Sequence, residues 1–137
     1  MKNDKTDNHE QLFWEEIDRL FPDMIKAIAS LSKKSYLSIT NLRTGITWWS
    51  ERAMDYFGMK ENYTIRGMEK ANRKIHPDDV ATFKRGFKER VDGKNLDTAW
   101  EYRIQDGDSY NRFNAMARVL YDEQKQPFII IIRYDNY

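Results

Sequence analysis

Cysteine is absent from this chain of 137 residues, and its absence excludes disulfides, thiolate metal sites and a thiol nucleophile. Histidine is scarce, since His9 and His76 are the only two. No serine or threonine stands in a sequence context with these histidines that suggests a catalytic triad. The sequence also lacks a glycine-rich phosphate loop and a cluster with the spacing of a zinc site. An enzyme is therefore the weaker hypothesis.

A strong charge of one sign is missing as well. The chain has 23 Lys and Arg against 22 Asp and Glu, a net charge of +1, which leaves no basic field to attract nucleic acid or a membrane surface. The N-terminus leads into no signal-peptide segment, and the longest apolar run is far too short to span a bilayer. We expect a cytoplasmic protein without membrane or nucleic-acid partners, and its length predicts one domain with a core.

That longest apolar run, Phe128–Tyr134, organises the chain. Four consecutive isoleucines between aromatic residues favour a β-strand. Because successive side chains point to opposite faces, one face carries Phe128, Ile130, Ile132 and Tyr134, and the other carries Ile129, Ile131 and Arg133. Both faces are mostly apolar, which predicts a central strand that is covered on both sides.

An amphipathic helix is predicted near the N-terminus. Apolar residues recur in steps of three and four at Phe13, Ile17, Leu20, Met24, Ile28 and Leu31. Pro22 lacks a backbone N–H and clashes with the preceding turn, so we expect a kink or break near Phe21. We divide the chain into this helical segment, residues 1–34, and a domain of residues 35–137.

Turn and capping signals divide the remaining residues. Gly45 and the pair Asp106-Gly107 predict two hairpin turns, and Ser50 and Pro77 predict helix starts. The expected strands are 36–42, 46–50, 98–104, 110–121 and 128–134. The expected helices are 51–57, short turns within 65–72, and 77–91.

The order of these elements, with its motifs, resembles the PAS domain family. The motifs are His76-Pro77-Asp78-Asp79 at a helix start, Glu101-Tyr102-Arg103 in a strand, and Asp106-Gly107 in the next turn. The resemblance covers residues 35–137 and implies an α+β fold, a five-stranded antiparallel sheet with short helices on one face. We expect the N-terminal helix to cover the apolar face formed by Trp100, Tyr102, Phe113, Val119, Phe128, Ile130 and Ile132.

The opposite phase of the last three strands is polar. Its members are Glu101, Arg103, Arg112, Asn114 and Arg133. Read without the family, this phase is solvated; the resemblance implies that it faces the short helices and lines a sensory cavity. Phe57 is included among the candidate ligand contacts. Such a pocket suits a ligand with a carboxylate or phosphate, and an internal ion network without a ligand is the alternative.

We expect no coloured cofactor and no metal. Without cysteine, the flavin chemistry of photosensory relatives cannot occur. His76, fixed beside Pro77 at a helix entrance, is interpreted as structural rather than as a haem ligand. Asp78 and Asp79 could act as acid and base, but the dipole of the helix explains two carboxylates there more simply.

The function that the resemblance implies is that of a non-catalytic sensory module in a bacterial signalling protein. The module would bind a small ligand, form a homodimer through the N-terminal helix, or both. It would thereby control a C-terminal output domain such as a GGDEF diguanylate cyclase. The alternatives are a ligand-free dimerisation module of the same fold, the input domain of a histidine kinase, and a small-molecule enzyme of unknown type.

Overall fold

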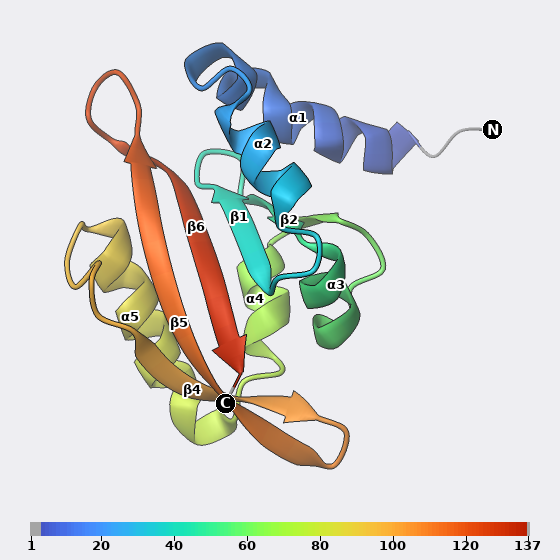
Figure 1. The fold of residues 1–137 in the computed structure, drawn as a ribbon, viewed down its shortest axis with the longest axis vertical. Helices are drawn as coiled ribbons and strands as arrows, with labels where there is room; N and C mark the ends of the chain where they lie inside the picture. Colours follow the sequence, from blue (N-terminus) through green and yellow to red (C-terminus); the bar gives the residue numbers. More distant parts are fainter. Residues whose placement is uncertain (1–3, 137) are drawn as a thin grey trace.

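An antiparallel sheet lies at the centre of the computed structural model, which describes residues 4–136, with side chains from residue 8 to residue 135 (Figure 1). Its strand order is β3-β2-β1-β6-β5-β4. The sheet has six strands, so the predicted number of five is wrong. The additional strand, β3, has three residues and pairs with β2 at the edge. A strand this short gives too little alternation to be recognised in the sequence.

The helices and strands follow the predicted order. The strands are β1 (Leu37–Asn41), β2 (Ile46–Trp49), β3 (Tyr63–Ile65), β4 (Trp100–Asp106), β5 (Ser109–Tyr121) and β6 (Pro127–Asn136). The helices are α1 (Asp4–Leu20), α2 (Met24–Leu31), α3 (Glu51–Phe57), α4 (Gly67–Asn72) and α5 (Val80–Val91), with a 3-10 turn η1 (Pro77–Asp79) before α5. The fold is α+β, and both predicted hairpins, β1–β2 and β4–β5, are confirmed.

The isoleucine strand β6 is central, as predicted, because it pairs with β1 on one side and β5 on the other. The predicted alternation fails at one residue. Leu120 lies opposite Ile129 while Tyr121 lies opposite Pro127, so Phe128 is an extra residue in a bulge. Phe128 therefore packs with Ile129, whereas Ile130 packs on the other face of the sheet.

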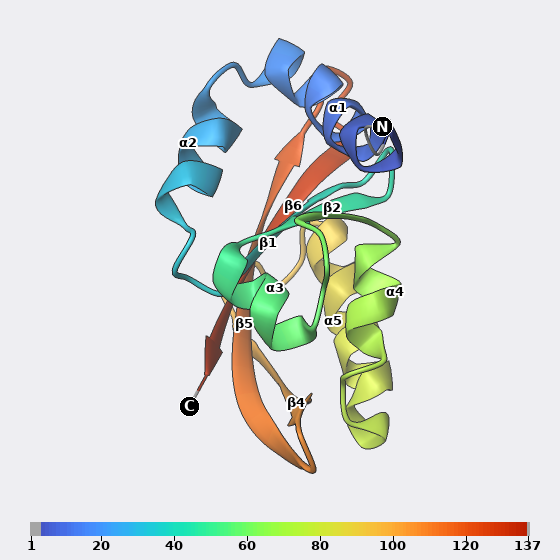
Figure 2. The same cartoon turned by 90° about the vertical axis from the view of Figure 1, so that its right-hand side faces the viewer.

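Buried side chains form two clusters, one on each face of the sheet. Figure 2 shows α2 on one side of the sheet, with α4 and α5 on the other. The cluster beneath α3, α4 and α5 includes Trp49, Phe57, Phe83, Trp100, Tyr102, Phe113, Ile130, Ile132 and Tyr134. The cluster beneath α1 and α2 includes Phe13, Ile17, Ile25, Ile39, Trp48, Phe128 and Ile129.

The helices that cover the two faces of the sheet are the reverse of those predicted. The apolar phase of β4, β5 and β6 faces α3–α5 and not the N-terminal helices. Of the residues predicted to lie beneath those helices, Phe128 alone is in their cluster. Alternation in a sequence separates the two faces of a strand, but it does not say which helix covers which face.

The N-terminal helices α1 and α2, together called the arm below, are separated at Pro22, which confirms the predicted break. Asp23 has a left-handed backbone with φ 67° between them. The arm covers β1, β2 and the start of β6 through Phe13, Ile17 and Ile25, each fully buried. No helix within residues 4–136 is long and apolar enough to cross a membrane.

Candidate functional site

The space between the sheet and α3–α5 is occupied by aromatic rings. Phe57, on α3, is 3% exposed and packs against Trp49 and Tyr134 with ring centroids 5.2 and 5.7 Å away. Phe83, on α5, meets Tyr102 edge-on at 4.8 Å. Phe57 is thus a core residue. Among the predicted ligand contacts, it is the one whose side chain lies in the cluster beneath α3–α5.

Two buried tyrosines place hydroxyls within this core. Burial raises the pKa of Tyr102 and of Tyr134 above the ordinary value, so both phenols are neutral. The Tyr134 hydroxyl is 3.1 Å from the hydroxyl of Ser38. The Tyr102 hydroxyl has no hydrogen-bond partner among the side chains and backbone of the described residues. An unpaired buried hydroxyl destabilises the core unless water or another small polar group reaches it.

The five predicted polar residues lie on the outer face of the sheet, which is the face opposite α3–α5. Of these residues, Arg103 contacts a short helix, through Asp79 of η1. For the other four the expectation that they face the short helices is wrong, because the large apolar side chains of the other phase take that place. The Arg112 and Arg133 side chains are 64% and 59% exposed. Asn114 lies between Glu101 and Asp135 in neighbouring strands. Ligand binding by this set stays a prediction.

Three members of the set line one groove of 230 Å³. They are Glu101, Arg103 and Arg112, and Asp79 and Tyr102 complete the lining. Arg103 holds Asp79 with three hydrogen bonds, from its Nε (2.8 Å), its Nη2 (3.0 Å) and its backbone N–H (2.8 Å). These bonds keep the pKa of Asp79 below its usual value. The groove therefore contains an internal ion network, the alternative considered from the sequence.

The same contacts bear on the acid–base hypothesis. Asp79 stays ionised beside Arg103, which makes it a poor proton donor near neutral pH. Asp78 is on η1, and its backbone N–H donates to Nδ1 of His76 at 3.1 Å. The His76 ring also packs on Tyr110 at 4.6 Å. These residues start a helix, as the structural interpretation predicted.

Arg133 lies apart from that groove and lines two others. One, of 440 Å³, is formed with Leu37, Met116, Ala117, Arg118 and Ile131. The other, called the Arg52 groove below, has a volume of 400 Å³ and is lined by Lys34, Ser35, Tyr36, Arg52, Arg133, Tyr134 and Asp135. Lys34 and Arg52 were not predicted, because nothing local in the sequence brings a linker, a helix and the last strand together.

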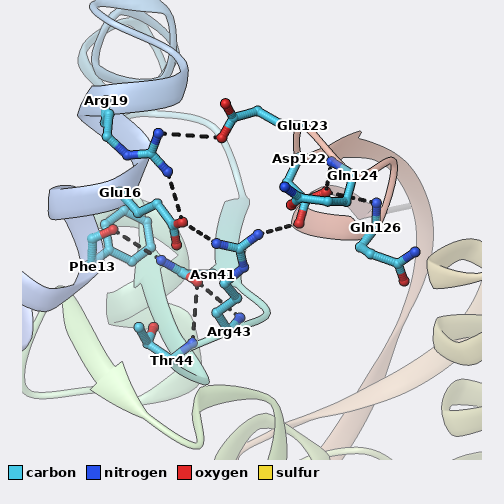
Figure 3. Close-up of polar contacts among 10 residues, drawn as sticks. All are labelled: Phe13, Glu16, Arg19, Asn41, Arg43, Thr44, Asp122, Glu123, Gln124 and Gln126. Atoms are coloured by element: carbon cyan, nitrogen blue, oxygen red, sulfur yellow. Dashed lines mark hydrogen bonds and ion pairs between the residues drawn. The ribbon is translucent and has the colours of Figure 1, made fainter.

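A polar network ties the arm to two turns of the sheet (Figure 3). Arg43, in the β1–β2 turn, donates to Glu16 on α1 and to Asp122 in the β5–β6 turn. Arg19, on α1, reaches Glu16 at 3.2 Å and Glu123 at 3.3 Å. One arginine of the sheet thus bridges segments far apart in the sequence, a contact that the sequence did not reveal.

The buried amide group of Asn41 holds the β1–β2 turn and the arm in place. The Asn41 side chain, 1% exposed, donates to the Phe13 carbonyl of α1 at 3.2 Å and accepts from the Arg43 backbone N–H at 3.0 Å. The Arg43 guanidinium lies 4.8 Å from the Phe128 ring centroid. Backbone N–H groups, that of Gln126 foremost, hold the pKa of Asp122 below its usual value, as does Arg43. Both partners of this ion pair therefore stay charged.

A second contact anchors the arm at β3, the edge strand next to β2. The Trp14 indole N–H donates to the Tyr63 hydroxyl at 2.7 Å, and Phe13 meets the Tyr63 ring at 5.5 Å. The arm is therefore fixed to edge strand β3 and to the turns on either side of β6. This geometry makes the arm part of the packed structure.

Solved structures of similar fold belong to signalling proteins. A sensory box histidine kinase/response regulator from Burkholderia thailandensis is 16% identical, with a TM-score of 0.60 over 81% of this chain and 82% of that chain. The N-terminal domain of a diguanylate cyclase with PAS/PAC sensor from Marinobacter aquaeolei is 15% identical, with a TM-score of 0.59 over 75% and 94%. A domain of a putative light and redox sensing histidine kinase from Haloarcula marismortui is 12% identical, with a TM-score of 0.58 over 81% and 97%.

These identities are too low to carry more than the fold. The search of curated proteins gives no match. A family model for the PAS fold matches residues 46–132, which begin at β2, so that the arm and β1 lie outside the match. The match spans more than half of the chain and includes α3–α5 and most of the sheet. The chain therefore belongs to the PAS fold family.

Proposed function

We propose that this chain is a non-catalytic sensory module that passes a signal to an output domain of a longer protein, such as a diguanylate cyclase or a histidine kinase. The docked arm is the observation that carries the proposal. It lies outside the residues of the family match, yet it buries Phe13, Ile17 and Ile25 against the sheet. The arm is held by one apolar cluster, by hydrogen bonds to Asn41 and Tyr63, and by ion pairs. Helices docked on a domain in this way can shift between two positions.

The arm also supports the proposal of a homodimer. Leu31, at the end of α2, is 86% exposed, and Leu12 and Met24 are 42% and 43% exposed. A second arm packed against this segment would remove these apolar side chains from water. A two-fold contact between two arms would join the modules of two chains.

Light scattering after size exclusion would test the homodimer. We expect the protein to be a dimer and Leu31→Glu to shift it to a monomer. Ala81→Glu is the matched control, because residue 81 is exposed on α5 and the substitution adds the same charge away from the arm. A monomeric wild type, or equal dissociation of both variants, would contradict the proposal.

A ligand-free interaction module is the second candidate, and the aromatic packing of the interior favours it. Phe57, Phe113 and Tyr102 are each at most 3% exposed and fill the space beneath α3–α5. Under this alternative the arm alone carries the signal.

We also expect purified protein to be colourless, since the chain has no cysteine for a flavin adduct. An absorbance band in the visible range would contradict this expectation.

A further inference from the structure

Three cationic side chains and one carboxylate surround the Arg52 groove, which has a volume of 400 Å³. We propose that this groove binds a small oxyanion, a carboxylate or a phosphate. The proposal deepens the proposed function and rests on it in one respect: the bound anion would act on the linker that joins the arm to the sheet. Lys34, Arg52 and Arg133 supply the positive charge, and Asp135 opposes it.

Arg52 is oriented before any ligand binds. Its guanidinium lies over the Tyr36 ring, 4.4 Å from the centroid, and Nη1 donates to the Lys34 carbonyl at 3.2 Å. A guanidinium has five N–H donors in a planar fork, so most remain available for an oxyanion. Among the described residues, no carboxylate pairs with Arg52 or with Lys34. A preoriented arginine loses less freedom when it binds an anion.

Arg133 is held by a weak internal competitor. Its Nε and Nη2 lie 3.3 and 3.2 Å from the Asp135 carboxylate, and both side chains are more than half exposed. Exposed ion pairs of this kind contribute little. An oxyanion that also contacts Arg52 and Lys34 would therefore displace Asp135, and three cations against one carboxylate leave the lining with a charge of +2.

The groove lies where three segments meet. Lys34, Ser35 and Tyr36 connect α2 to β1, Arg52 is in the first turn of α3, and Arg133 is near the end of β6. The linker is already bound to β6, because the Tyr134 backbone N–H donates to the Tyr36 carbonyl at 2.8 Å. An anion that bridges Lys34, Arg52 and Arg133 would tie the base of the arm to α3 and to the end of the central strand.

Two other candidate sites in the molecule are weaker. The groove with Arg103 and Arg112 has its arginines already paired with Asp79 and Glu101. Tyr102 lines that same groove, but its unpaired hydroxyl is a single neutral group buried in the core. The Arg52 groove is distinguished by two cations, Lys34 and Arg52, for which no carboxylate partner is found among the described residues.

Calorimetry with inorganic phosphate and with citrate, in a buffer of low ionic strength matched with chloride, tests the proposal. We expect wild-type binding, and Arg52→Gln should weaken it by about tenfold or more, the loss of a charge-assisted hydrogen bond. Asp135→Asn should bind the probe more tightly, because Arg133 is released. Arg85→Gln is the matched control, because Arg85 is an exposed arginine on α5 outside this groove, and this variant should bind like the wild type.

Each result decides the proposal. No binding to the wild type, equal loss in Arg52→Gln and Arg85→Gln, or weaker binding by Asp135→Asn would overturn it. Light scattering on the same samples separates it from the proposed dimer. Phosphate binding by a monomeric protein would contradict the dimer alone, and a dimer that binds neither probe would contradict the groove alone.

Discussion

Arg103 and Arg133 differ in the carboxylate that each one contacts. Asp79 binds Arg103 through three hydrogen bonds, whereas Asp135 binds Arg133 at the edge of an open groove. The two arginines occupy the same phase of the strand alternation, so the sequence makes them look equivalent. Their different partners hold Arg103 in a three-bond contact and leave Arg133 in an exposed pair, which is the reason that the proposed oxyanion site includes Arg133.

Asp79 gives a prediction for stability in acid. Its pKa in the folded protein is lower than the ordinary 3.8, chiefly because of the hydrogen bond from Arg103. A depressed carboxyl pKa contributes stability that is complete above the ordinary value and is lost as the pH falls through the folded value. Urea unfolding at a series of pH values below about 5 should show a shallower loss of stability for Asp79→Asn than for the wild type.

The neighbouring carboxylate supplies the control. Asp78 has an 81% exposed side chain, and its substitution with Asn leaves its backbone N–H bond to His76 in place. Asp78→Asn should therefore keep the wild-type dependence on pH. If both variants flatten the profile equally, the Arg103 contact is not the cause.

At the scale of elements, the arm depends on one arginine that belongs to the sheet. Arg43 joins Glu16 of the arm to Asp122 of the β5–β6 turn. The pair of Arg43 with Glu16 is partly exposed and is screened by salt. The Asp122 carboxylate is 5% exposed and is screened less, and the apolar cluster beneath the arm is not screened. The ion pairs should therefore set how often α1 opens, and the apolar cluster should set whether it docks at all.

Arg43→Gln is predicted to raise hydrogen exchange in α1 without raising it in β5 and β6. The substitution removes the charge that bridges two acidic side chains. The Asn41 side chain still accepts from the backbone N–H of residue 43 in the turn and still donates to the Phe13 carbonyl of the arm. Added salt should speed exchange in α1 of the wild type and have little effect in the variant. Arg19→Gln is the comparison, because its contacts to Glu16 and Glu123 are more exposed and its effect should be smaller. Unchanged exchange in Arg43→Gln would show that the network does not hold the arm.

Local signals predicted the elements well but not their partners. Pro22 and Ser50 act within a few residues, so the break in the arm and the start of α3 could be read from the sequence. The bulge at Phe128 depends on pairing with β5, and β3 gains its hydrogen bonds from β2. Neither depends on its own sequence alone, so neither could be predicted.

The same limit explains the candidate site. The two phases of β4, β5 and β6 follow from alternation, but the choice of cover depends on how three short helices and the arm compete for the sheet. The helices carry Phe57 and Phe83, which match the aromatic phase, and the arm takes the aliphatic side chains of β1 and β6. The Arg52 groove needs three segments that are distant in sequence, and no motif marks such a meeting.

For the whole molecule, the arm is predicted to be a required part of the core. Deleting residues 1–32 would expose Ile39, Trp48, Phe128 and Ile129, each at most 8% exposed with the arm in place. Each large side chain returned to water costs about 1.5–3 kcal/mol, so the sum is comparable with the whole stability of a domain. The truncated protein should aggregate or lose its cooperative thermal transition.

A milder change tests the same point in a chain of full length. Phe13 and Ile17 are fully buried on α1, whereas Leu12 on the same helix is 42% exposed. Phe13→Ala should cost about 3–5 kcal/mol in urea unfolding, and Leu12→Ala should cost much less because little of its surface leaves water on folding. A truncated domain that stays soluble, monomeric and as stable as the full chain would show that the arm merely rests on the sheet. In that case the Phe13→Ala loss would also be small, because the two measurements depend on the same buried cluster.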